Sequence, residues 1–348
     1  MPSNIKAYSL SDPTKASGVI PKVLDHLRQP AYFKTALALY RRLQFGRFLD
    51  SSYLFTNRQW DYQSEQLDTP WFYAFVDRGC RPETEVWLFG NWEVETLPVS
   101  EAVTENHDEK GTARDQAIRA LLLDFIGLIK AMETPPSIHR PEDVLAAQSQ
   151  LANASNNAEP RLPNPDIMLF GALHSLTLPH LQSLSLLSPP LLPPFPNHTF
   201  HFPLSALPPP TPLPKTLRWG KLKPAHFPLV RSRTEIARQD YTLARLPNLA
   251  IFPVDEFDDA PPVAWAFVGL DGSLTTLHVE GAWRRLGLGG MRRGMMGQRR
   301  GLWRMGMWRW GMRRAWACAG VWAGGRRGLF IGSMLIWGVF DGDVVGGG

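Results

Sequence analysis

The stretch AWAFVGLDGSLTTLHVEGAWRRLGLG, residues 264–289, decides the fold of this chain. The apolar run at 263–269 is typical of a buried strand, and residues 274–279 form a second β-type run. Asp271-Gly272-Ser273 between them predicts a tight hairpin turn. The glycine-rich segment 283–290 then leaves the second strand, and this is where α/β folds hold phosphate groups.

The glycine-rich segment has the composition of an anion-binding turn. Gly287 and Gly289 lack the Cβ atoms that would keep a diphosphate away from the backbone amides. Arg284 or Arg285 can add charge-assisted hydrogen bonds. The alternative is an ordinary surface turn between a strand and a helix. A dinucleotide fingerprint is excluded, because its third glycine would fall at Arg292.

Hydrophobic periodicity predicts further elements upstream of this stretch. Helices are expected at 24–27, 32–43, 113–132 and 224–233. Strands are expected at 71–77, 84–89, 216–219 and 250–253, with the first two joined as a hairpin. Residues 166–175 predict a strand that leads into a short helix, whereas the segment 145–161, rich in Ala, Ser and Asn, predicts a poorly packed connection.

Composition divides the chain into five parts. Prolines recur between Ser188 and Pro214 and exclude a helix interior or a central strand there. We interpret this segment as an extended linker rather than as an SH3-type ligand. The predicted parts are a flexible N-terminus at 1–20, a mixed α+β domain at 21–187, the linker at 188–215, a half-domain at 216–290 and a low-complexity tail at 291–348.

The basic character of the protein is confined to the tail. Residues 291–348 hold ten arginines and two aspartates, a net charge of +8, against +5 for the whole chain. The remainder is net acidic, which argues against nucleic-acid or acidic-membrane binding by the protein as a whole. Six tryptophans, seven methionines and no periodicity allow two hypotheses for the tail. The first hypothesis is that the tail is translated in the wrong reading frame or through an intron. The second is that it is an Arg-rich tail that binds single-stranded nucleic acid.

Cysteine usage and hydropathy bound the compartment. Cys80 and Cys318 are too few for a disulfide framework or a cysteine-rich zinc site, and we expect no metal. The polar N-terminus has no secretory h-region, and the apolar run at 329–340 is too short to span a bilayer. These features predict a cytoplasmic protein.

Residues 264–289 resemble the central strand pair and pyrophosphate loop of GNAT acyltransferases. The loop has the Arg-x-x-Gly-x-Gly pattern of that superfamily at Arg284, Gly287 and Gly289. The flanking Leu-Asp-Gly-Ser-Leu and Leu-His-Val motifs are similar to the glycine N-acyltransferase-like branch, and to its fungal-type members in particular. Shorter similarities extend the resemblance discontinuously at 76–87, 218–220 and 232–234.

The resemblance implies an α/β fold with a mixed α+β sheet in a two-part GNAT-like architecture. Its C-terminal GNAT domain would be incomplete and followed by a disordered tail. It also implies transfer of an acyl group from acetyl-CoA, or from another acyl-CoA, to the amine of a small molecule or amino acid. The implied catalytic bases are Glu280 and His278. The implied cofactor-binding residues are Leu277, Val279, Arg284, Arg285, Gly287, Leu288, Gly289 and Gly290.

Both catalytic candidates have a structural alternative. His278 can be a packed core residue, and Glu280 can be a solvated loop residue. No tyrosine follows Tyr241, although GNAT enzymes usually place a thiolate-protonating tyrosine beyond the loop. A second hypothesis is therefore a catalytically inactive protein that at most binds acyl-CoA.

Overall fold

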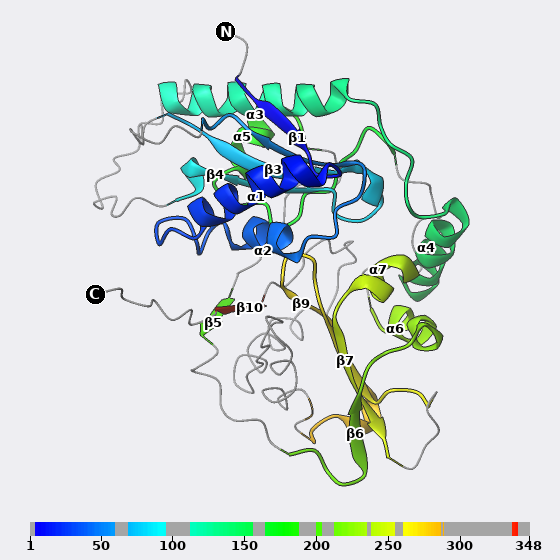
Figure 1. Ribbon diagram of the computed structural model, residues 1–348. Coiled ribbons are helices and arrows are strands. Elements are labelled where there is room, and N and C mark those ends of the chain that lie inside the picture. The colour runs from blue at the N-terminus through cyan, green and yellow to red at the C-terminus, as the bar shows by residue number, and fades with distance from the viewer. Residues whose placement is uncertain are drawn as a thin grey trace, which may run out of the picture. The chain divides into compact units, whose positions relative to one another are not determined.

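The computed structural model describes residues 4–59, 69–94, 112–155, 164–187, 200–203, 212–234, 238–254, 260–286, 288 and 336–339. The chain forms an N-terminal unit, residues 1–145 with 161–196, and a C-terminal unit, residues 146–160 with 197–348. Each unit has its own four-stranded antiparallel sheet with helices, which confirms the predicted α/β class (Figure 1). No helix in the described ranges has the length and hydrophobicity needed to cross a membrane.

The sheet of the N-terminal unit has the strand order β1-β2-β3-β4, and every neighbouring pair is antiparallel. The strands are β1 (Lys6–Ser9), β2 (Ser52–Thr56), β3 (Phe72–Asp77) and β4 (Val86–Gly90). The predicted hairpin is thus confirmed as β3 and β4. Val86 also forms a parallel bridge with Phe170, so the segment predicted as a strand at 166–175 contributes one bridge instead.

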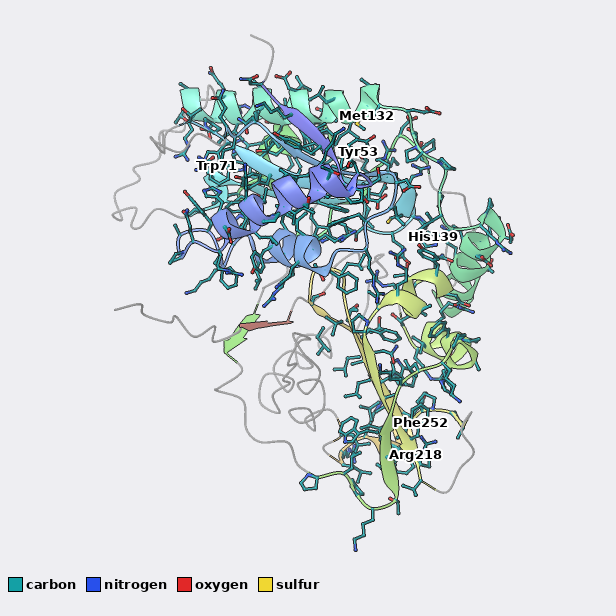
Figure 2. All side chains as sticks on the ribbon, in the orientation of Figure 1. Tyr53, Trp71, Met132, His139, Arg218 and Phe252 are labelled. Carbon is teal, nitrogen blue, oxygen red and sulfur yellow. The ribbon has the colours of Figure 1, made fainter. Side chains whose placement is uncertain are left out.

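Helices cover both faces of this sheet (Figure 1). They are α1 (Pro13–Leu27), α2 (Leu37–Phe45), α3 (Ala113–Ala131) and α5 (Leu178–Ser183). Phe125 of α3 packs on Phe55 and Phe72, with ring centroids 5.5 and 4.9 Å apart. In Figure 2, Trp71 marks the aromatic cluster on the opposite face, beside Tyr73 and His26. The helix predicted at 113–132 is thus confirmed as α3.

The prediction of a flexible N-terminus at 1–20 is wrong for residues 4–20. β1 pairs with β2 from Lys6 opposite Thr56 onward. Asp12 caps α1, because its side chain accepts hydrogen bonds from the amides of Thr14 and Lys15 at 2.9 and 3.3 Å. An aspartate followed by proline is a preferred start for a helix, so the signal was present in the sequence.

The segment 145–161, predicted as a poorly packed connection, is helical in its described part. Residues up to Ser155 belong to α4 (Pro141–Ser155). Pro141 stands at the start of the helix, acidic residues follow in its first turn, and alanine is the best helix former. Local helix propensity therefore outweighed the Ser and Asn content.

The sheet of the C-terminal unit has the strand order β6-β7-β8-β9, again antiparallel throughout. The strands are β6 (Leu217–Gly220), β7 (Asn248–Pro253), β8 (Ala264–Val268) and β9 (Leu274–Val279). All four were predicted, as was α6 (Phe227–Ser232) with the 3-10 turn before it. The short helix α7 (Asp240–Arg245) was not.

Alternating side chains give this second sheet two apolar faces. Phe252, Trp265 and Phe267 pack with α6 and α7, whereas Ile251 and Ala264 face the other way. Figure 2 labels Arg218 of β6 beside Phe252, and the guanidinium carbon lies 5.2 Å from that ring centroid. One face of the sheet thus packs against α6 and α7, and the other face carries a separate apolar cluster.

Two further strands pair within the C-terminal unit. β5 (Phe200–Pro203) and β10 (Ile336–Val339) form a parallel two-stranded sheet. The sequence assigned no strand to either segment, because the first lies in the Pro-rich linker and the second in the tail. Proline is compatible with β5, because neither strand of a two-stranded sheet is central. Tail residues 291–335 and 340–348 lie outside the described residues.

Candidate functional site

His278 and Glu280 lie at the end of β9 on one face of the C-terminal sheet. They are two residues apart, and successive side chains of a strand point to opposite faces. His278 is the register partner of Trp265, whose side chain is buried on the α6 and α7 face. Glu280 reaches Arg233, immediately after α6. The structure therefore brings the two candidate bases together.

The His278 imidazole is packed flat on Trp265. Their ring centroids are 4.7 Å apart and their planes differ by 25°. Nε2 of His278 has less than 1 Å² of accessible surface and lies 3.7 Å from Oε1 of Glu280, longer than a hydrogen bond. Burial lowers the pKa of His278; Glu280 opposes this effect, and Arg284 and Arg233 add to it. Near neutral pH the imidazole is therefore uncharged, the state in which it accepts a proton.

The Glu280 carboxylate has a defined ionic partner. Its Oε1 accepts a hydrogen bond from Nε of Arg233 at 3.0 Å. The two side chains are 26% and 42% exposed, so the pair is partly screened by solvent. Arg233 lies in the segment 232–234, one of the short similarities to the acyltransferase family, and the sequence alone assigns it no role. An ion pair across 47 residues leaves no local signal from which it could have been predicted.

The backbone of β9 is open on one side in the described residues, where β8 is its one ladder partner. The amide of Glu280 donates to the Val263 carbonyl at 2.9 Å. In an antiparallel ladder the preceding residue, Val279, therefore turns its amide and carbonyl away from β8. A one-residue register shift lies further back in β9, where Thr276 has a φ of 51°. This bulge holds Leu277 between the paired parts of the strand.

The turn after β9 uses part of its hydrogen-bonding capacity internally. The amide of Trp283 donates to the Glu280 carbonyl at 2.9 Å, and that of Arg284 donates to Gly281 at 3.3 Å. Nε of Arg284 donates to the Val279 carbonyl at 3.0 Å. Arg285 has a φ of 70°, in the left-handed region that favours glycine. The amides of Trp283 and Arg284 are therefore already used inside the turn and are not free to bind a diphosphate.

Leu288 returns to the sheet on the face opposite Trp265. Its side chain is 2% exposed and packs in the cluster that contains Leu217, Ile251, Val263 and Ala264. A ligand can thus meet Leu288 only through its backbone. The other candidate loop residues, Gly287, Gly289 and Gly290, lie outside the described residues.

Two buried carboxyl groups in the N-terminal unit were missed by the sequence analysis. Burial raises the pKa of Glu85 to about 7, although Arg78 donates to it at 2.9 Å. Burial also raises the pKa of Glu93 to about 8, against the hydrogen bond from Thr177. In the described ranges, no three His, Cys, Asp or Glu side chains gather as a metal site would require.

Comparison with protein families gives one further finding. The family model of the acyl-CoA N-acyltransferase verG N-terminal domain matches residues 11–201, more than half of the chain. The chain belongs to this family. Membership in an acyl-CoA N-acyltransferase family confirms the superfamily resemblance, while the glycine N-acyltransferase-like branch stays a prediction. The matched range ends before β6, so the β8–β9 hairpin lies outside it.

Other comparisons add little to the family assignment. An X-ray structure of a Drosophila protein is similar at 14% sequence identity, over 83% of this chain and 82% of that chain, with a TM-score of 0.41. Comparison with curated proteins gives no match. The assignment to the acyl-CoA N-acyltransferase family therefore rests on residues 11–201.

Proposed function

We propose that this protein is an acyl-CoA-dependent N-acyltransferase that transfers an acetyl or other acyl group to the amine of a small molecule or amino acid. The observation that carries the proposal is the family match over residues 11–201. The geometry of β9 supports it, because an open strand edge can pair with the amides of a pantetheine arm as it pairs with a peptide.

The proposed substrate path follows the open edge of β9. Leu277 and Val279 contact the pantetheine arm through their backbone, and the outward amide of Val279 polarises the thioester carbonyl. The diphosphate lies at the turn that follows, where Arg284 and Arg285 provide positive charge. The candidate residues Gly287, Leu288, Gly289 and Gly290 are proposed to offer further backbone amides to the diphosphate.

The proposed chemistry is direct attack of a neutral amine on the thioester. The amine nitrogen bonds to the carbonyl carbon, the carbon–sulfur bond breaks, and the electron pair leaves on the CoA sulfur. The proton of the amine passes to a base, for which His278 and Glu280 are the candidates. Returning that proton to the thiolate gives an amide and free CoA.

Binding and turnover test this proposal separately. Acetyl-CoA at about a hundred times its Kd should stabilise the full chain by roughly 2.7 kcal/mol, since it binds the folded state alone. Turnover is then measured as free CoA thiol released in the presence of a panel of amines and amino acids. Absence of thiol release with every amine of the panel would refute the proposed transfer, and absence of stabilisation would also refute acyl-CoA binding.

A pair of arginine variants locates the binding site. Arg284→Gln removes a charged donor from the turn and should weaken acetyl-CoA binding about tenfold or more, the effect of one charge-assisted hydrogen bond. Arg218→Gln on β6 is the matched control and should bind as the wild type does, because Arg218 packs on Phe252 instead. Equal losses in the two variants would place the ligand elsewhere.

Acyl-CoA binding without turnover is the second candidate function. It is favoured by the Arg233–Glu280 ion pair, which occupies one of the two candidate bases, and by the lack of any tyrosine after Tyr241. Acetyl-CoA would then stabilise the chain, but no amine would release free CoA thiol. The same two assays therefore distinguish the candidates.

A further inference from the structure

Arg233 donates a hydrogen bond to the Glu280 carboxylate, and neither the family match nor the loop pattern assigns Arg233 to the chemistry. We propose that Arg233 is a positioning residue that holds the Glu280 carboxylate away from His278, so that His278 stays neutral and takes the proton of the amine through Nδ1. This inference rests on the proposed acyltransferase function.

The geometry centres on a single oxygen atom. Oε1 of Glu280 lies 3.0 Å from Nε of Arg233 and 3.7 Å from Nε2 of His278. The shorter contact is a hydrogen bond and the longer one is not. Arg233 therefore holds the oxygen that would otherwise approach the imidazole.

The position of Arg233 is set by its own backbone. It follows the last residue of α6, and its amide donates to the Val230 carbonyl at 3.2 Å. Val230 is fully buried under the sheet that carries Trp265. The guanidinium is thus attached to a packed helix rather than to a free loop, which gives the ion pair a defined location.

The surroundings of His278 select the atom that can meet a substrate. Trp265 covers one face of the ring, and Nε2 has less than 1 Å² of accessible surface on the side of Glu280. Nδ1 is the remaining ring nitrogen. A neutral imidazole with its proton on Nε2, facing Glu280, leaves the Nδ1 lone pair to accept a proton.

Three charged groups act on this imidazole. Burial lowers the pKa of His278 most; Glu280 raises it, and Arg284 and Arg233 lower it. Arg233 thus lowers the pKa of His278 in two ways. Its own positive charge disfavours the imidazolium, and it keeps Oε1 of Glu280 from approaching the ring. Both effects favour the neutral ring that the proposed proton transfer requires. The amine nitrogen bonds to the thioester carbonyl carbon while its proton moves to Nδ1, and the carbon–sulfur bond breaks with its electron pair on the sulfur. The imidazolium then returns the proton to the CoA thiolate.

The test is the pH profile of kcat/KM for the full chain with acetyl-CoA and a reactive amine. Arg233→Gln should move the acid limb to higher pH, because removing the guanidinium leaves Glu280 free to pair with protonated His278. The alkaline plateau should stay within about twofold of the wild type, because the base itself is intact. A uniform loss with an unmoved limb, or a raised KM for acetyl-CoA, would overturn the positioning role.

Matched variants separate this role from general damage to the fold. Arg231→Gln is the control, because Arg231 lies two residues away on α6 and pairs with Asp240. It should leave the profile unchanged, and Arg233→Lys, which keeps the charge, should restore most of the wild-type profile. Glu280→Gln should move the limb to lower pH, because it removes the carboxylate that raises the pKa of His278. A limb that does not move in this variant would contradict the proposed coupling.

A second readout needs no catalysis. NMR titration of the His278 ring, with its signal assigned by its loss in His278→Asn, should give a higher pKa in Arg233→Gln than in the wild type or in Arg231→Gln. The neutral ring should carry its proton on Nε2. A protein that releases no CoA thiol but titrates in this way would refute the proposed function and keep the role of Arg233 on His278. A proton on Nδ1, or an unmoved pKa in Arg233→Gln, would refute the positioning role itself.

Discussion

Substitution of the buried Glu93 by glutamine should remove a pH-dependent loss of stability. Glu93 is 2% exposed, and its carboxylate accepts a hydrogen bond from the Thr177 hydroxyl, which in turn accepts one from Nε1 of Trp92 at 2.9 Å. Glutamine has nearly the same shape, its amide oxygen can accept the Thr177 hydroxyl, and it does not ionise.

The magnitude follows from the raised pKa. Burial raises the pKa of Glu93 from 4.5 to about 8, so the folded chain keeps this proton to higher pH than the unfolded chain. The contribution to stability is full below about pH 4.5 and is lost as the pH rises towards 8. A change of one in pKa is worth about 1.4 kcal/mol, so the whole loss is of the order of 5 kcal/mol as an upper figure.

The assay is urea unfolding of wild type and Glu93→Gln at several pH values between 5 and 8. A loss of this order corresponds to a fall of roughly 2 M in the urea midpoint, for an m value of about 2–3 kcal/mol/M. Between pH 5 and pH 8, the urea midpoint of Glu93→Gln should fall less than that of the wild type. Burial also raises the pKa of Glu85, but Glu85 contributes the same pH dependence of the unfolding free energy to the wild type and to Glu93→Gln.

An exposed glutamate gives the control for the Glu93 experiment. Glu142→Gln, in the first turn of α4, should follow the pH dependence of the wild type. If wild type and Glu93→Gln lose stability in parallel between pH 5 and 8, Glu93 ionises in the folded chain as it does in water, and the reasoning from burial is refuted.

Three further substitutions test the packing. Thr112→Ala removes the capping box of α3 and should lower the free energy of unfolding by about 1 kcal/mol, measured by urea unfolding, whereas Thr112→Ser should cost less. Phe125→Ala should cost about 3–5 kcal/mol in the same measurement, because the ring is fully buried between α3 and the sheet. Leu288→Ala should lower the melting temperature through a loss of about 2–5 kcal/mol, and an unchanged melting temperature would show that the turn after β9 does not return to the core.

Much of the fold could be predicted because its signals are local. The β8–β9 hairpin combines two apolar runs with the turn predicted at Asp271-Gly272-Ser273, and Gly272 has a φ of 76° there. The helix at 113–132 repeats apolar residues at helical spacing and is confirmed as α3. In contrast, α4 and the start of α1 were missed because Ser and Asn content and position in the chain were given more weight than helix propensity and the Asp12-Pro13 cap.

The site could be predicted only in part. His278 and Glu280 are two residues apart, and this spacing, which can be read from the sequence, places both on one face of a strand. The partners that set their chemistry lie far away in the chain: Arg233 is 47 residues from Glu280, and Trp265 meets His278 only through strand register. The pairing of Glu93 with Thr177 spans 84 residues and is equally invisible to local patterns.

Hydrogen exchange of the full chain, with and without acetyl-CoA, tests the central claim most directly. The account predicts that acetyl-CoA slows exchange in the peptide that contains Leu277 and Val279, and in the turn from Arg284 to Gly290, with little change in β6. Acetyl-CoA that binds but protects another part of the chain, or that protects none, would contradict it.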